Sequence, residues 1–116
     1  MTKRLVEIRT YLLKSGTLED FHQAMVQHAL PMVRASGMDV VAFGRSQHEQ
    51  ETYFLVRAYD SLEHLKTQQD SFYTSVAWRQ GPRELLVSRI DSYLNTLLFL
   101  SAESIEDMRR LNTSVM

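Results

Sequence analysis

Hydrophobic and polar residues alternate strictly over residues 5–13, which is the pattern of a β-strand with two different faces. The even positions are mostly apolar, and we expect them to form a core packed under helices. The odd positions place an acid, a base and a phenol between leucines, which is typical neither of solvent-exposed surface nor of an ordinary core. These odd positions are Leu5, Glu7, Arg9, Tyr11 and Leu13.

A helical pattern follows the strand, with apolar residues every three or four positions from Leu18 onward. Thr17 is a favourable N-cap residue, and Asp20 places an acid in the first turn. Pro31 lies inside this pattern. Because proline lacks a backbone N–H and clashes with the preceding turn, we expect a kink or break near it. Gly37 is suited to the end of the helical region.

The remaining pattern predicts three further strands and several helical segments. Strands are predicted at residues 39–46, 52–59 and 92–100, from their valine and phenylalanine content and from alternation of side chains between two faces. A helical region begins after Asp60-Ser61 and breaks at Gly81-Pro82, with a short helix to follow. In this helical region the apolar stripe is interrupted by polar residues at 69–71. Residues 101–111 read as a short surface helix.

The element order strand, helix, strand, strand, helix, strand predicts an α+β ferredoxin-like fold with a four-stranded antiparallel sheet and helices on one face. We expect one domain over residues 1–100, followed by a C-terminal helix and tail over 101–116. The first and third strands should be central neighbours. We expect their odd faces to lie on the side without helices, where a second copy would close a barrel as a two-fold homodimer.

Composition narrows the classes of function. The chain has 116 residues, 44% hydrophobic content and a formal net charge of −1 without long charged runs, so nucleic-acid binding is not favoured. It has no cysteine, which excludes disulfides and thiolate chemistry. No apolar run is long enough to span a membrane, and the first residues lack the apolar region of a signal peptide. We therefore expect a cytoplasmic protein.

Several motifs give the chain a resemblance to the NIPSNAP family of the dimeric α/β-barrel superfamily, over residues 6–98. They are Glu7-Ile8-Arg9-x-Tyr11 with Lys14-x-Gly16, Phe21, Pro31 followed by Gly37-Met38, and Trp78 in the segment Trp78-Arg79-Gln80-Gly81-Pro82-Arg83-Glu84. Glu51-Thr52 stands where members commonly carry an asparagine before the third strand. The resemblance implies a small dimer without a cofactor. By superfamily analogy it also implies an oxygenase-like, isomerase-like or decarboxylase-like activity.

The first candidate site consists of polar residues on the odd faces: Glu7, Arg9, Tyr11, Arg57 and Tyr59. An arginine there could hold a ligand carboxylate bidentately, and a tyrosine could orient a carbonyl. Glu7 could act as a general base if burial raised its pKa. The alternative is that Glu7 pairs with Arg9 or Arg57 and only stabilises a polar interface.

His28 and a group of aromatic residues are further candidates. His28 lies at the edge of an apolar helix face and could be a general base, although a partly buried structural histidine is the alternative. Trp78, together with Phe72 and Tyr73, could line an apolar pocket for a ring-shaped ligand. In the alternative, Phe72 and Tyr73 belong to the core and Trp78 fixes the helix break against the sheet. The histidine spacings include no metal-binding pattern, so no metal site is expected.

Two functions follow as hypotheses. In the first, the protein binds or transforms a small apolar or carboxylate-bearing molecule in the barrel cavity. In the second, it is a non-catalytic accessory or scaffold homodimer whose polar interior is structural. A cavity with an incompletely paired arginine favours the first hypothesis, and a filled, fully ion-paired interior favours the second.

Overall fold

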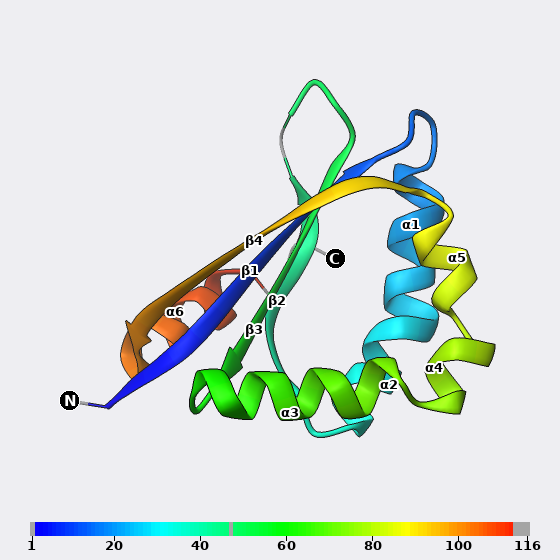
Figure 1. The fold of residues 1–116 in the computed structure, drawn as a ribbon. Coiled ribbons are helices and arrows are strands. Elements are labelled where there is room, and N and C mark those ends of the chain that lie inside the picture. The colour runs from blue at the N-terminus through cyan, green and yellow to red at the C-terminus, as the bar shows by residue number, and fades with distance from the viewer. Residues whose placement is uncertain (1, 47, 113–116) are drawn as a thin grey trace.

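The protein forms a four-stranded antiparallel sheet with the strand order β2-β3-β1-β4. The computed structural model describes residues 2–46 and 48–112 (Figure 1). This is the ferredoxin-like α+β arrangement that the sequence predicts, with β1 and β3 as central neighbours. The strands are β1 (Lys3–Leu13), β2 (Asp39–Ser46), β3 (Thr52–Tyr59) and β4 (Ile90–Ser101).

Helical segments connect the strands and follow the last one. Between β1 and β2 lies a rod made of α1, η1 and α2, and between β3 and β4 lie three separate helices (Figure 1). The segments are α1 (Leu18–Ala24), η1 (Met25–Ala29), α2 (Leu30–Ala35), α3 (Leu62–Tyr73), α4 (Val76–Gln80), α5 (Arg83–Val87) and α6 (Ala102–Asn112). The predicted C-terminal helix at 101–111 is therefore confirmed.

The helices before β4 cover the odd face of the sheet, so the prediction that this face is free of helices is wrong. Tyr11, Leu13 and Leu55 pack in one core with Phe21 of α1 and Phe72 of α3. The physical reason is that the odd face carries large aromatic and aliphatic side chains around its polar centre. That apolar rim gives the helices an area to pack against.

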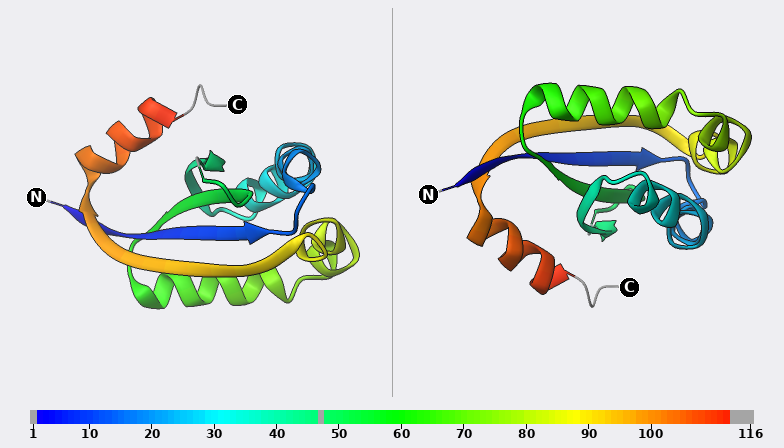
Figure 2. Two further views of the ribbon diagram at one scale, coloured as in Figure 1. Left: turned by 90° about the horizontal axis from the view of Figure 1, so that it is seen from above. Right: turned by 90° about the horizontal axis from the view of Figure 1, so that it is seen from below.

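The even side of β1 is more open than its odd side, and α6 covers part of the even face. On β4 both sides are open, because Leu94 on the even side and Leu97 and Phe99 on the odd side are exposed. Ile105 of α6 packs on a smaller cluster that includes Val6 and Val56. Figure 2 shows α6 and α3 on opposite sides of the sheet. Asp39 of β2 holds α6 in place, because Arg109 donates to its carboxylate over 3.0 and 3.2 Å. The even positions thus form a second, smaller core with α6, whereas the helices before β4 pack on the odd positions.

The rod between β1 and β2 contains a π-helical segment, η1, just before Pro31. The backbone N–H of Leu30 bonds to the carbonyl of Met25, five residues back. Because Pro31 has no N–H and its ring crowds the preceding turn, the helix widens there instead of ending. The predicted break at the proline is therefore a wide turn, and this turn faces the sheet with Met25 and Ala29, both buried.

The start of α1 differs from its prediction. Thr17 makes no side-chain capping bond. Instead Glu51, from the connection between β2 and β3, accepts from the backbone N–H groups of Gly16 at 2.5 Å and Leu18 at 2.8 Å. A carboxylate at a helix N-terminus satisfies free N–H groups and complements the helix dipole. The cap therefore comes from a residue more than thirty positions away in sequence.

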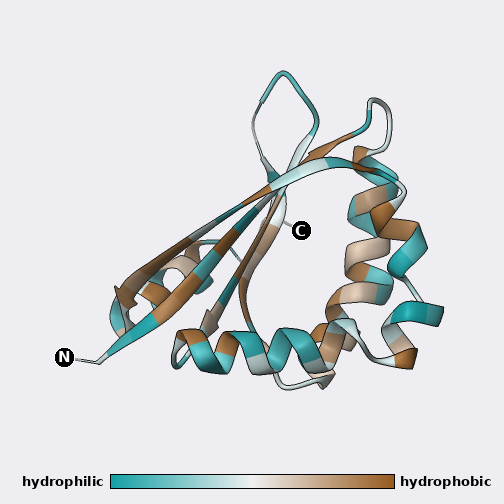
Figure 3. Ribbon diagram, in the orientation of Figure 1, coloured by the Kyte–Doolittle hydropathy of each residue, from teal (hydrophilic) through white to brown (hydrophobic). Residues whose placement is uncertain are grey.

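Along α1 and α2 apolar and polar residues follow one another in turn, and α3 is largely hydrophilic with short apolar stretches (Figure 3). In the part of the chain that the structure describes, no helix is long and apolar enough to cross a membrane. The cytoplasmic location stays a prediction from the sequence.

Candidate functional site

The centre of the odd face is a buried polar network around Glu7. The strand register sets Glu7 opposite Arg57 on β3, and sets its neighbour Arg9 opposite Asn95 on β4. Glu7 and Arg57 are both 0% exposed. A buried carboxylate and guanidinium are stable in a protein only when they are paired and hydrogen-bonded.

The carboxylate of Glu7 is fully used. Its Oε1 accepts from Arg57 Nε at 2.9 Å, lies 2.8 Å from Arg57 Nη2, and accepts from the Tyr59 hydroxyl at 3.3 Å. Its Oε2 accepts from Arg9 at 3.0 Å, Gln69 at 3.0 Å and Asn95 at 2.9 Å. Six donor contacts leave no lone pair free to take a proton from a ligand.

Burial alone raises the pKa of Glu7, but the guanidinium groups of Arg57 and Arg9 outweigh burial and lower it below its ordinary value of 4.5. Glu7 is therefore ionised at neutral pH and is a weak base, so the condition for the general-base hypothesis, a pKa raised by burial, is not met. Its role in this geometry is to fix the positions of Arg9 and Arg57.

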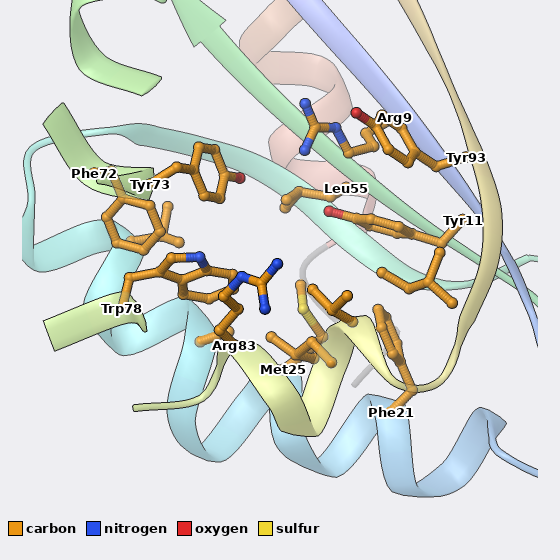
Figure 4. Close-up of a pocket in the computed structure, with 15 residues that line it drawn as sticks. Arg9, Tyr11, Phe21, Met25, Leu55, Phe72, Tyr73, Trp78, Arg83 and Tyr93 are labelled. Atoms are coloured by element: carbon orange, nitrogen blue, oxygen red, sulfur yellow. The ribbon is translucent and has the colours of Figure 1, made fainter. Parts of the chain in front are cut away.

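Next to the network lies a cavity of about 240 Å³ between the odd face and the helices (Figure 4). Each strand and helical segment from β1 to β4, with the exception of β2, contributes at least one side chain to the wall. Most of the wall is apolar, and these residues are Phe21, Met25, Ala29, Val33, Leu55, Phe72, Leu86, Val87 and Ile90. The polar residues of the wall are Arg9, Tyr11, Tyr73, Trp78, Arg83 and Tyr93.

An aromatic cluster forms one side of the cavity. The Trp78 ring lies 5.2 Å from Phe72 and 5.4 Å from Tyr73, measured between ring centroids. Ser75 caps the short helix α4 that carries Trp78. At Gly81, which ends α4, an added Cβ would lie only 2.3 Å from the carbonyl oxygen of Ala77, so only glycine permits this turn.

The polar groups gather at the β1 end of the cavity. Arg9 lies over the ring of Tyr93, with its guanidinium carbon 4.8 Å from the ring centroid. The hydroxyl groups of Tyr11 and Tyr73 both point into the enclosed space, and Arg83 reaches toward it from α5 (Figure 4). Burial raises the pKa of Tyr11 to about 12, so this phenol stays protonated at neutral pH and can donate a hydrogen bond.

Comparison with known proteins agrees with this geometry. The sequence profile of the NIPSNAP family matches residues 6–102. The chain belongs to the NIPSNAP family. No curated protein sequence matches it.

Solved structures show the same fold. A NIPSNAP-like domain protein from Burkholderia xenovorans, described as uncharacterised, is 15% identical with a TM-score of 0.78 and covers 85% of this chain and 86% of its own. A NIPSNAP family protein from Agrobacterium tumefaciens is 16% identical with a TM-score of 0.79, covering 90% and 92%. A Bordetella bronchiseptica protein, named for a suggested role as an antibiotic biosynthesis monooxygenase, is 21% identical with a TM-score of 0.61, covering 87% and 97%.

The predicted site residues of this NIPSNAP protein fall into three groups. Arg9, Tyr11 and Trp78 line the cavity. Glu7, Arg57 and Tyr59 are fully buried behind its wall and form the supporting network. His28 is exposed and does not line the cavity, because Met25 and Ala29 on either side of it turn the opposite face of η1 toward the sheet.

Two residues of the network around Glu7, Gln69 and Asn95, were not predicted from the sequence, whereas Tyr73 was a candidate for the wall of an apolar pocket together with Phe72 and Trp78. Gln69 and Tyr73 lie one turn apart on α3, where Gln69 donates to Glu7 and Tyr73 accepts from Arg57 at 2.9 Å. The polar interruption of the helical stripe at 69–71 was the signal for Gln69. For Asn95, the signal was a lone amide within a largely apolar strand. Over residues 2–46 and 48–112, no group of three or more acidic or histidine side chains could hold a metal ion.

Proposed function

We propose that this protein binds a small, largely apolar molecule in the cavity between its sheet and helices. The observation that supports the proposal best is the wall itself: aromatic and aliphatic side chains surround about 240 Å³, and polar groups are concentrated at one end. Ligand pockets in proteins commonly combine such an apolar wall with a few convergent polar groups that fix orientation.

The polar end favours a molecule that presents a hydrogen-bond acceptor. Its groups are N–H and O–H donors, whereas no carboxylate or imidazole lines the cavity in the described part of the chain. An apolar ring would pack against Trp78 and Phe72, with its oxygen toward Arg9 and Tyr11. Binding and orientation are thus what these residues can do by themselves.

Chemical transformation of the bound molecule is a further part of this proposal. A cofactor-free oxygenase-like or isomerase-like reaction is the expectation from the superfamily, and the likeness to proteins named for a monooxygenase role concerns the fold. Such a reaction would have to use reactivity of the ligand itself, because the residues of the wall offer no general base. The competing hypothesis is a scaffold protein whose cavity has no ligand.

We also propose that the partner of the open even face is a second copy of the chain. The even positions of β1 from Val6 to Leu12, of β3 and of β4 include no charged residue. Leu94 on this face is 66% exposed. A charge-free apolar face is complementary to itself, as a two-fold interface requires. We further propose that the protein is located in the cytoplasm, as expected from its sequence.

Titration with 3-phenylpropan-1-ol, followed by tryptophan fluorescence, tests the proposed function. Trp78 is the only tryptophan of the chain, so its emission reports directly on the cavity. We expect a saturable change that Val33→Phe abolishes by placing a ring in the cavity. The same substitution at Val76, which is exposed on α4, should leave the titration unchanged. A wild-type protein without a saturable change would support the scaffold hypothesis instead.

A further inference from the structure

The polar end of the cavity contains donors that lack an acceptor and one positive charge that lacks a counter-ion. We propose that the cavity binds a weakly acidic phenol or enol in its deprotonated form, with the single anionic oxygen held between Arg9, Tyr11 and Tyr73. This inference rests on the proposed function, because it specifies the chemical class of the ligand for the same cavity.

The buried cluster of Arg9, Arg57 and Glu7 has a net positive charge. Arg9 and Arg57 each carry one positive charge, and among residues 2–46 and 48–112 Glu7 carries the only negative charge that contacts them. The side chain of Arg9 is only 11% exposed, so water screens its charge poorly. One uncompensated positive charge at the wall of an apolar cavity favours a ligand with a single negative charge.

The contacts of Arg9 limit how a ligand can reach its guanidinium, because they exclude a bidentate carboxylate on the Nε edge. Its Nε donates to Asn95 Oδ1 at 2.9 Å, and its Nη2 donates to Glu7 Oε2 at 3.0 Å. The Nε–Nη2 edge of the guanidinium is therefore occupied, and a ligand can approach only the end that carries Nη1 and the second N–H of Nη2. A single anionic oxygen at this end is matched by the nearby donors, whereas the second charged oxygen of a carboxylate would add a desolvation cost in a mostly apolar cavity.

The two phenols, Tyr11 and Tyr73, are further donors at this end of the cavity. Tyr73 accepts from Arg57 Nη1 at 2.9 Å, so its own proton must point to another group, and no acceptor for it is found among the described residues. Tyr11 lines the same cavity, and no acceptor for its hydroxyl proton is found among the described residues. Both hydroxyl groups point into the cavity in Figure 4. A ligand oxygen between them would receive hydrogen bonds from both.

The residues around the cavity determine where the proton of the ligand goes when the ligand ionises. The charged groups that line the cavity are Arg9 from β1 and Arg83 from α5, and Glu7 is saturated behind the wall. No acid or histidine from the helices lines it in the described ranges. The proton is therefore released to water, and the anion is stabilised by fixed donors in a partly dehydrated site, where such contacts are stronger than in water.

Spectrophotometric titration of 4-nitrophenol tests this inference, because its phenol and phenolate absorb differently. We expect the wild-type protein to bind the phenolate at least about tenfold more tightly than the phenol, which lowers the pKa of the bound probe by at least about one unit. Tyr11→Phe and Tyr73→Phe should each reduce this shift, and Arg9→Met should remove it. Tyr53→Phe is the matched control, because its hydroxyl bonds to His22 outside the cavity.

Two further probes separate the possible outcomes. 4-Nitroanisole, which cannot ionise, should bind the wild type and should lose less affinity in the tyrosine variants than 4-nitrophenolate does. 4-Nitrobenzoate should bind no more tightly than 4-nitrophenolate. Binding of nitroanisole together with an unshifted or raised pKa of bound nitrophenol would overturn the inference and leave the proposed function intact, as would preferential binding of the benzoate. Failure of all three probes to bind would count against the proposed function as well.

Discussion

Replacing Ala29 by leucine is the most informative perturbation of the cavity. Ala29 is 2% exposed and lies in the cavity wall on η1. Ala24, five residues earlier on α1, is 6% exposed and packs in the same core but does not line the cavity. The same substitution therefore adds the same atoms either to empty space or to a filled core.

The expected magnitudes differ in sign. Leucine adds about three carbon groups, and at ~0.8 kcal/mol for each that is buried Ala29→Leu gains roughly 2 kcal/mol. Loss of rotamer freedom on burial of the leucine takes back ~0.5–1 kcal/mol, so the net gain is about 1–2 kcal/mol. Ala24→Leu overpacks the core and costs about 1–3 kcal/mol. The two variants should differ in free energy of unfolding by roughly 2–5 kcal/mol.

Thermal unfolding measures this difference. For a domain of this size, about 1 kcal/mol corresponds to roughly 4 °C in Tm. We expect Ala29→Leu to unfold at a higher temperature than wild type and to lose the fluorescence response to 3-phenylpropan-1-ol, whereas Ala24→Leu should unfold at a lower temperature. Equal destabilisation by both substitutions would mean that no space exists beside Ala29, and it would refute the cavity.

Three further predictions concern the network, the open face and the turn after α4. Glu7→Gln should cost about 3–5 kcal/mol in urea unfolding, because it removes the buried counter-ion. Since the pKa of Glu7 is lowered in the folded protein, its stabilisation is present above 4.5 and is lost as the pH falls through the lowered value, so wild type should lose more stability than Glu7→Gln on acidification. Leu94→Lys should convert the proposed dimer into a monomer in light scattering, whereas Val76→Lys, at a similarly exposed site, should not; a wild-type monomer would contradict the proposed interface. Gly81→Ala should weaken ligand binding, because its Cβ would meet a carbonyl oxygen, whereas Gly16→Ala, with φ of 82° and open space, should cost only about 1 kcal/mol and leave binding unchanged; unimpaired binding by Gly81→Ala would show that this turn does not shape the cavity.

The strands and their order could be predicted because period-two alternation is a local signal. The segments 39–46 and 52–59 were predicted with the bounds that β2 and β3 have in the structure. The choice of face was not local. Both faces of β1 carry apolar residues, and only the packing of Phe21 and Phe72 on the odd face decides which side the helices cover. The alternation alone could not supply that information.

The site was predicted in part for the same reason. Glu7 and Arg57 were found because an acid and a base stood on alternating strands, but their paired state depends on donors from other elements. Gln69 reaches the network from α3, and Asn95 comes from β4. The prediction for His28 failed because the wide turn at η1 determines which side chains face the sheet, and residue spacing alone does not reveal such a turn.

A crystal structure of the protein with 4-nitrophenol, grown above neutral pH, would show directly where and how the probe binds. We expect the ring between Trp78 and Leu55, with its oxygen within hydrogen-bonding distance of Arg9, Tyr11 and Tyr73, on the helix-covered face of the sheet. An empty cavity, or a probe bound on the even face between two sheets, would contradict this expectation.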